Sequence, residues 1–268
     1  MKHSVNRFFW PVVAAAALFS AQNGLCADWA TEVSSANPVN WFRFDELSGS
    51  VVNDHGSANI DGSYVGAVGL GSAGLVGGAA AFDAGSHVFL GAANLPTDWT
   101  LEAIYKADTV AGGVSMGLVG ADFAAASDRM AIKAEQWNET GQMGYTVFGV
   151  VDVTFTDSLA ATPASFAHVV FVGQSSGVSL YVNGALAGSD ATSTPLARWA
   201  LGTGAIRADG TLVDPLTGVI DEIVIYGRAL SPAEISAHYN AIPEPTVLTL
   251  GLLGALLVLG ARYGVRRR

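Results

Sequence analysis

The chain has 268 residues, of which half are hydrophobic and 13% are charged, and its net charge at neutral pH is −10. An apolar content this high excludes a mostly disordered chain. The acidic excess argues against nucleic acid as a partner, because phosphate binding needs clustered Lys and Arg. The single cysteine, Cys26, excludes a disulfide scaffold and a metal site built from several cysteines.

The first 27 residues are typical of a secretory signal peptide. Lys2 and Arg7 provide a positive start, an apolar stretch follows, and the segment contains no acidic residue. We expect signal peptidase to cut after Ala27. The alternative is a lipoprotein acylated on Cys26, which is less favoured because the bulky Leu25 precedes the cysteine.

Residues 241–268 form a second sorting segment. Pro243-Glu244-Pro245 precedes an apolar run over residues 246–261, and four arginines follow before the end of the chain. As a helix the run would span about 24 Å, which is short against a hydrocarbon core of roughly 30 Å. A short span that ends in basic residues predicts a transmembrane helix with a cytoplasmic tail. A buried core helix is the weaker alternative, because the run has no polar face.

This order of Pro-Glu-Pro, short apolar helix and arginine-rich end resembles the PEP-CTERM sorting signal of Gram-negative bacteria. The resemblance implies that an exosortase of the inner membrane recognises Pro243, Glu244 and Pro245 and processes the chain nearby. It also implies export with transient anchoring in the inner membrane, followed by association with extracellular polysaccharide or a biofilm matrix.

Residues 28–240 predict an all-β domain. Short apolar or alternating runs recur between Gly, Asp, Asn and Ser, which is typical of strands and turns. Examples of such runs are residues 41–44, 87–90, 99–105, 144–150, 168–172, 178–182 and 218–226. Many short strands with few helices predict a β-sandwich or a barrel. The domain keeps 22 acidic and seven basic residues, which favours divalent cations and disfavours polyanionic partners.

Three segments carry more specific local patterns. Asn183-Gly184 between two apolar runs predicts a hairpin with a type I′ turn, because both residues accept positive φ. Ser231-Pro232-Ala233-Glu234 predicts a helix start with a capping box, and Ile235 and Tyr239 would share one face of that helix. Residues 120–142 predict a long connection.

The order of these pieces over roughly residues 38–240 resembles the LamG-like jelly-roll domains of the concanavalin A-like lectin/glucanase superfamily. The marks, in chain order, are Trp41-Phe-Arg-Phe-Asp45-Glu46-x-Ser-Gly49, Asp54, Gly78-Ala-Ala-Ala-Phe82-Asp83, Trp99-Thr-Leu-Glu102, the strand of His168, Leu180-Tyr-Val-Asn-Gly184, Gly218-x-Ile-Asp221-Glu222-x-x-Ile-Tyr226 and Arg228-Ala-Leu-Ser231-x-x-Glu234-Ile. Two positions depart from the family pattern, namely Phe166, where Trp is frequent, and Ala84, where Gly is frequent. The resemblance implies an antiparallel jelly-roll β-sandwich, whereas the departures weaken any transfer of ligand residues.

A catalytic function within this superfamily needs carboxylates that alternate on one strand, so that all of them face the cleft. The sequence has no Glu-x-Asp-x-x-Glu pattern, and the adjacent residues Asp221 and Glu222 are expected to point to opposite faces. Neither a serine-nucleophile elbow nor a zinc-binding His-Glu-x-x-His motif occurs. We therefore expect no enzymatic activity, and a glycan-active enzyme is the alternative.

The acidic loops predict one structural calcium ion. Hard cations take carboxylate and backbone oxygens, and the resemblance implies a calcium site in such loops. The candidate ligands are Asp45, Glu46, Asp54, Asp83 and Asp221. The alternative is that these carboxylates cap turns. For the adjacent pair, one carboxylate would then satisfy backbone donors, and the other would pair with a basic residue such as Arg228.

The aromatic residues divide into candidates for ligand contact and candidates for the core. Trp137, Tyr145 and Trp199 lie near expected loops and could stack on sugar rings. Trp41, Phe82 and Tyr226 are expected to pack between the sheets, because large aromatics on alternating strands dominate sandwich cores. His168 lies in an apolar strand and is expected to be a structural histidine whose hydrogen bonds are satisfied.

Together these features predict an exported, non-enzymatic surface or matrix module that is sorted by exosortase and binds a glycan or a matrix protein. A purely structural matrix protein without a ligand is the remaining alternative.

Overall fold

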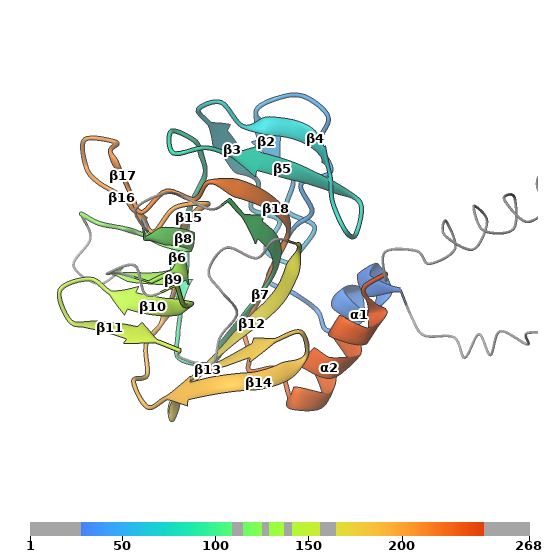
Figure 1. Ribbon diagram of the computed structural model, residues 1–268, viewed down its shortest axis with the longest axis vertical. Coiled ribbons are helices and arrows are strands. Elements are labelled where there is room, and N and C mark those ends of the chain that lie inside the picture. The colour runs from blue at the N-terminus through green and yellow to red at the C-terminus, as the bar shows by residue number, and fades with distance from the viewer. Residues whose placement is uncertain (1–27, 109–114, 125–128, 137–140, 156–164, 244–268) are drawn as a thin grey trace, which may run out of the picture.

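A computed structural model of the protein describes residues 28–108, 115–124, 129–136, 141–155 and 165–243. Its strands form two large antiparallel sheets, called A and B, that pack face to face (Figure 1). This arrangement confirms the predicted all-β sandwich and is consistent with a jelly roll. The predicted signal peptide and the predicted transmembrane helix lie outside the described residues.

Sheet A is centred on β7. The strand order is β14-β13-β12-β7-β18-β5-β4, and β1 pairs with β18 beside this path. The strands are β1 (Asn40–Phe42), β4 (Gly69–Ala73), β5 (Gly78–Phe82), β7 (Trp99–Ala107), β12 (Ala167–Gln174), β13 (Gly177–Val182), β14 (Ala185–Asp190) and β18 (Gly218–Tyr226). β7 pairs antiparallel with β12 on one side and with β18 on the other, and its side chains are buried on both faces of the sheet.

Sheet B has the strand order β11-β10-β9-β8-β15-β6-β3-β2. The strands are β2 (Val51–Val52), β3 (Gly62–Val65), β6 (His87–Leu95), β8 (Met116–Asp122), β9 (Met130–Glu135), β10 (Gly144–Val147), β11 (Val151–Thr154) and β15 (Leu196–Leu201). A small hairpin of β16 (Ala205–Ile206) and β17 (Leu212–Val213) adds to this sheet through a parallel pairing of β16 with β8.

The main core lies between the two sheets and follows the alternation of side chains along the strands. In β7, Leu101, Ala103 and Tyr105 face this core, whereas Ile104 faces the opposite side. Phe82 also belongs to the main core, which confirms the expectation that it packs between the sheets.

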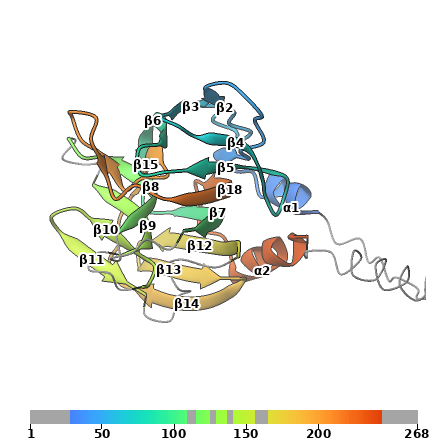
Figure 2. The same ribbon diagram turned by 45° about the horizontal axis from the view of Figure 1, so that its top comes forward.

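The outer face of sheet A carries a second apolar cluster, which is covered by α1 (Trp29–Ser35) and α2 (Pro232–Ala241). Figure 2 shows both helices on the same side of this sheet. Trp41 and Tyr226 belong to this second cluster, so the expectation that they pack between the sheets is wrong. The two helices provide the cover that lets outward-facing aromatic residues be buried.

Two of the predicted local motifs are confirmed. Asn183 and Gly184 both have positive φ, 49° and 78°, and they connect β13 to β14. Ser231 caps α2 with a capping box. On α2, however, the fully covered residues include Ile235 and His238, whereas Tyr239 is 38% exposed.

Two elements differ from the sequence expectation. Strand β9 lies inside the segment 120–142 that was predicted to be a connection, and all six of its residues are buried. The helix α1 was not predicted; Asp28 caps it by accepting a hydrogen bond from the N–H of Thr31. The charged residues in β9 hide its strand pattern, because Lys133 and Glu135 are unusual in a buried strand.

Candidate functional site

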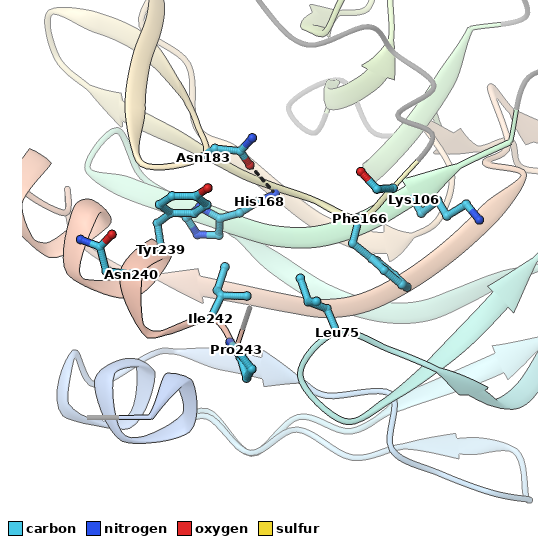
Figure 3. Close-up of a pocket in the computed structure, with 10 residues that line it drawn as sticks. Leu75, Lys106, Phe166, His168, Asn183, Tyr239, Asn240, Ile242 and Pro243 are labelled. Carbon is cyan, nitrogen blue, oxygen red and sulfur yellow. Dashed lines mark hydrogen bonds between the residues drawn. The ribbon is translucent and has the colours of Figure 1, made fainter. Parts of the chain in front are cut away.

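A cavity of about 420 Å³ lies on the outer side of sheet A, between α2 and the start of β12. Figure 3 shows its lining side chains, which come from both elements, from the β13–β14 turn, from β7 and from the loop before β5. The lining residues are Leu75, Lys106, Ser165, Phe166, His168, Asn183, Tyr239, Asn240, Ile242 and Pro243. The pocket thus joins apolar side chains with amide, hydroxyl and ammonium groups.

The wall beside α2 depends on the hairpin turn. A Cβ atom on Gly184 would lie only 3.1 Å from the Cβ of Tyr239, so glycine at this position lets the helix approach the turn. The Tyr239 ring lies over the ring of His168, with 5.8 Å between the ring centroids. Asn183 accepts the backbone N–H of His168 at 3.3 Å, and this bond is the dashed line in Figure 3.

The floor beneath the pocket contains a buried carboxylate, Glu102 of β7. It accepts hydrogen bonds from Nε2 of His168 at 2.7 Å, from Nδ1 of His238 at 2.9 Å and from the Tyr226 hydroxyl at 2.9 Å. Glu102 is fully buried. Three elements of the outer face, β12, α2 and β18, are therefore joined at one carboxylate of β7.

The charges in this cluster stabilise one another. Burial by itself would raise the pKa of Glu102, but the hydrogen bonds from His168 and His238 outweigh it and lower the pKa to about 2. Burial opposes protonation of His238, whereas its hydrogen bond to Glu102 favours protonation, and the pKa of His238 is raised as a result. At neutral pH the cluster therefore holds an ionised carboxylate against donors on both histidines.

Among the described residues, only one of the two ring nitrogens of His168 has a hydrogen-bond partner. Its Nε2 is bound to Glu102, but its buried Nδ1 has no hydrogen-bond partner among the described residues. The ring of Trp29 packs edge-on against both histidines, at 5.7 Å from His168 and 6.0 Å from His238. In this way α1 also covers the two histidines of the cluster.

A second group of polar residues surrounds the turn at residues 74–78. Oδ2 of Asp221 accepts the N–H groups of Leu75 and Val76 at 2.5 and 3.1 Å. Oδ1 of Asp45 accepts the N–H of Gly78 at 2.6 Å. Two of the predicted calcium ligands, Asp45 and Asp221, therefore hold the same turn.

The turn offers carboxylate and carbonyl oxygens, which are the atoms that a hard cation such as calcium binds. Oδ1 of Asp221 is buried and has no partner in the described part of the chain. A Cβ on Gly74 would lie 2.4 Å from this oxygen and 2.5 Å from the carbonyl oxygen of Gly78, so both oxygens border one space. Burial, with a contribution from the charge of Asp45, raises the pKa of Asp221 to about 6. The described residues contain no group of three or more ligating side chains, so backbone oxygens would have to complete a calcium site.

Glu222 has a different partner from the one expected. Its carboxylate accepts the indole N–H of Trp41 at 2.7 Å and lies 3.9 Å from Nε of Arg43. Arg228 pairs with Glu234 instead. A break in the register between Ile220 and Glu222 interrupts the alternation in β18. Asp221 and Glu222 therefore both bond to residues on the outer side of sheet A, and the expectation of opposite faces is wrong.

The remaining calcium candidates lie in separate turns. Glu46 accepts hydrogen bonds from Asn53 and from the Tyr64 hydroxyl. Asp83 accepts the N–H of Gly85 in a tight turn. Asp54 accepts four donors, which are Nδ2 of Asn40 and the backbone N–H groups of Trp41, Gly56 and Ile60. The fold does not join these three carboxylates to the Asp45–Asp221 turn by any hydrogen bond between described residues.

The predicted sugar-contact residues have different environments. Tyr145 is fully buried in the main core, and its hydroxyl donates to Asp190 at 2.7 Å, so its ring is not accessible to a sugar. Trp199 is partly exposed and packs edge-on against Phe89, which is 40% exposed, on the outer face of sheet B. Trp137 lies outside the described residues.

The sorting motif lies at the end of the described chain. Pro243 lines the pocket, whereas Glu244 and Pro245 lie outside the described residues. Among the residues that the structure describes, no helix is long and apolar enough to cross a membrane. The predicted membrane helix at 246–261 is not among them, so it remains a prediction.

The sequence reasoning missed the pocket and the cluster beneath it. One signal was available, since Glu102 lies among apolar residues in β7 and a buried carboxylate needs partners. His168 is a second buried polar residue in a strand of the same kind. Pairing these two residues requires the register of β7 against β12, in which His168 lies opposite Ile104, and no local pattern reveals that register.

Comparison with known proteins identifies the fold family. A family model described as concanavalin A-like lectin/glucanases superfamily, Laminin_G_3, matches residues 82–236, which is more than half of the chain. No curated protein matches the sequence.

Solved structures resemble the fold at low sequence identity. Domain 4 of AbnA, a GH43 extracellular arabinanase from Geobacillus stearothermophilus, solved in complex with arabinotriose, is 17% identical with a TM-score of 0.55; the match covers 77% of this chain and 98% of that one. The Trypanosoma rangeli sialidase in complex with sialic acid is 18% identical with a TM-score of 0.53. That match covers 77% of this chain but only 33% of the sialidase. At these identities the likeness is one of fold.

Proposed function

Because the chain belongs to the concanavalin A-like lectin/glucanases superfamily, we propose that it is an exported, non-enzymatic glycan-binding module of the cell surface or extracellular matrix. The observation that carries the proposal is the pocket between sheet A and α2. The arabinanase domain and the sialidase were both solved with a carbohydrate bound, which supports the choice of a glycan as ligand.

The pocket suits a sugar ring in size and in chemistry. Its volume of about 420 Å³ falls within the range of roughly 300–1,000 Å³ that is usual for ligand sites. The rings of Phe166 and Tyr239 offer apolar faces to the CH groups of a pyranose. Asn183 uses its oxygen to accept the N–H of His168, so its amide NH₂ group can donate to a ligand hydroxyl.

The arrangement favours binding without cleavage. Glycoside hydrolysis usually employs two carboxyl groups that flank the scissile bond, and none of the ten residues that line the pocket carries one. The oxygens of Glu102 below the floor are occupied by its three partners. Asp221 and Glu222 are at most 1% exposed, so neither carboxylate can reach a substrate in this conformation.

Export and sorting belong to the same proposal. Signal peptidase would remove residues 1–27, and an exosortase would recognise Pro243, Glu244 and Pro245 while the C-terminal segment is held in the inner membrane. Fractionation of cells that carry the wild type or a Glu244→Ala variant tests this part. The wild type should reach the surface or the medium and the variant should accumulate in the inner membrane, whereas equal distribution would argue against sorting.

A structural calcium ion at the Asp45–Asp221 turn completes the proposal. These two carboxylates and the carbonyl oxygen of Gly78 would contribute to its coordination. The ion would neutralise the buried charge of Asp221 and fix the turn at residues 74–78, which carries Leu75 of the pocket wall.

The binding test uses a glycan array and affinity electrophoresis through gels that contain extracted matrix polysaccharide. Tyr239→Ala should lose retardation, whereas Phe89→Ala, which removes an exposed ring on sheet B, should keep it. The reverse result would move the site to the Phe89–Trp199 pair. No binding to any glycan would favour a structural or protein-binding role, and release of smaller sugars would favour the enzyme alternative.

A further inference from the structure

Lys133 is a buried lysine on the outer face of sheet B, whereas the pocket lies on sheet A. Its neighbours in β9, Ile132 and Ala134, face the main core, and the Lys133 side chain is only 1% exposed. Its partners on the two adjacent strands are Gly117 in β8 and Gly144 in β10. Because both partners are glycines, the lysine stem is not opposed by a side chain from either strand.

Asp214, directly after β17, brings its carboxylate into contact with the Lys133 amine. Its backbone has a φ of 52°, a left-handed conformation that Asp tolerates better than most residues. Its carbonyl accepts the N–H groups of Gly117 at 2.8 Å and Gly204 at 3.2 Å, which fixes its position over β8. A Cβ on Gly204 would lie 2.9 Å from Nζ of Lys133, so glycine is what leaves room for the contact.

The surroundings of the pair are largely apolar, and the Lys133 side chain is 1% exposed against 17% for Asp214. The ring of Phe148 lies 5.2 Å from Nζ of Lys133, and Phe123 packs edge-on against that ring. The hydroxyl of Ser115 lies 3.3 Å from Nζ and can accept one of its protons. Burial lowers the pKa of Lys133, although the nearby charges of Asp214 and Asp152 act in the opposite direction.

We propose that Lys133 and Asp214 condense to form an intramolecular isopeptide bond. Proton transfer within the pair gives a neutral amine and a neutral carboxyl group. Nζ attacks Cγ of Asp214, the Nζ–Cγ bond forms and one Cγ–O bond breaks. The departing oxygen leaves as water, with the carboxyl hydrogen and one hydrogen from the nitrogen. Lysine ammonium and aspartate carboxylate thus yield an amide and one water, and no further reactant is required.

Two physical effects favour this bond. Groups that a rigid scaffold holds in reacting geometry reach effective concentrations of roughly 10⁵–10⁸ M. A neutral amide also removes the desolvation cost of keeping two charges inside the protein. Residues 28–243 contain no cysteine, so no disulfide can cross-link the folded part of the chain. The isopeptide bond would instead join β9 to the residue directly after β17, and the linked residues are 81 positions apart in sequence.

Mass spectrometry of the full chain tests the proposal directly. The intact protein should be lighter than its sequence by one water molecule. Because an Asp-Gly succinimide, as at Asp61-Gly62 or Asp209-Gly210, also loses water, the bond must be located in a tryptic digest. Trypsin should fail to cut after Lys133, and peptide 130–198 should appear joined to peptide 208–228.

Amine labelling under denaturing conditions gives an independent reading, since the chain has only three lysines, Lys2, Lys106 and Lys133. Lys106 should be labelled completely and Lys133 not at all. The Asp214→Ala variant should have the full mass of its own sequence, with no water lost, and its Lys133 should be labelled. The control Lys106→Arg should keep the cross-linked peptide. A free tryptic peptide 130–133 from the unlabelled wild type, or a labelled peptide 130–198 that is not joined to peptide 208–228, would overturn the proposal whether or not the variants fold.

Discussion

Nδ1 of His238 lies 2.9 Å from Oε2 of Glu102, and this contact joins the last helix of the described chain to the central strand of sheet A. The helix supplies one wall of the pocket through Tyr239, Asn240 and Ile242. The shape of the pocket therefore depends on a buried ion pair beneath it. The helix α2 is thus positioned by this polar contact together with the apolar packing of Ile235 in the outer cluster.

We expect Glu102→Gln to lower the free energy of unfolding by about 3 kcal/mol, because removing one partner of a buried charged network leaves the others uncompensated. Urea unfolding followed by tryptophan fluorescence measures the change. The matched control is Glu234→Gln, which disrupts a partly exposed pair with Arg228 and should cost about 1 kcal/mol or less. Equal losses in the two variants would contradict a special role for the buried cluster.

The contribution of this cluster should depend on pH in a defined way. The lowered pKa of Glu102 gives stability that is present above its ordinary value of 4.5 and is lost as the pH falls toward about 2. The raised pKa of His238 gives stability that is present below its ordinary value of 6.5 and is lost as the pH rises through the raised value.

The measurement is the difference in unfolding free energy between wild type and Glu102→Gln across the pH range. We expect this difference to be largest between pH 4.5 and 6.5 and to decline on both sides. Taking the difference cancels the titration of Asp221 and of surface groups. A difference that does not change with pH would show that Glu102 acts through packing alone.

Calcium should raise the midpoint of thermal unfolding relative to a chelator, because an ion that binds only the native state stabilises it. Asp221→Asn should abolish this shift, since it removes the charge of the buried carboxylate. Asp83→Asn, which alters a carboxylate in a different turn, should retain the shift. If the wild type unfolds at the same temperature with calcium and with chelator, the turn holds no calcium.

Gly117→Ala should destabilise the protein by about 2 kcal/mol or more, as is usual when a core position is overpacked. A Cβ on Gly117 would lie 2.2 Å from the backbone nitrogen of Gly204, and a backbone atom cannot move aside as a side chain can. The control is Gly85→Ala, where the nearest atom, in Asp83, lies at 3.5 Å. Chemical unfolding of both variants tests the close contact between β8 and the segment that leads into β16.

The parts of the fold that could be predicted from sequence are those in which neighbours in the chain determine the structure. The type I′ turn at Asn183-Gly184 and the cap at Ser231 depend on residues within four positions of each other. The alternation that predicts a strand works for β7 because the apolar Leu101, Ala103 and Tyr105 face the core, whereas the polar Thr100 and Glu102 lie on the other face.

The candidate sites could not be predicted in the same way, because they arise from contacts between distant segments. Glu102 lies 66 positions from His168 and 136 from His238 in the sequence. The irregular register in β18, which turns Asp221 and Glu222 to the same side, has no local sequence signal that we identified. Lys133 was missed because a lysine in a fully buried strand makes sense only once Asp214 is placed beside it.

The position of α2 also determines how the domain responds to a pulling force applied at Pro243, the last described residue. Pro243 follows α2 almost immediately, so a force applied there would first reach the helix that bears His238. The helix lies across the outside of sheet A and is not hydrogen-bonded into it as a strand. A pulling force would therefore detach α2 from sheet A and open the pocket, while the hydrogen bonds between the strands of both sheets stay intact.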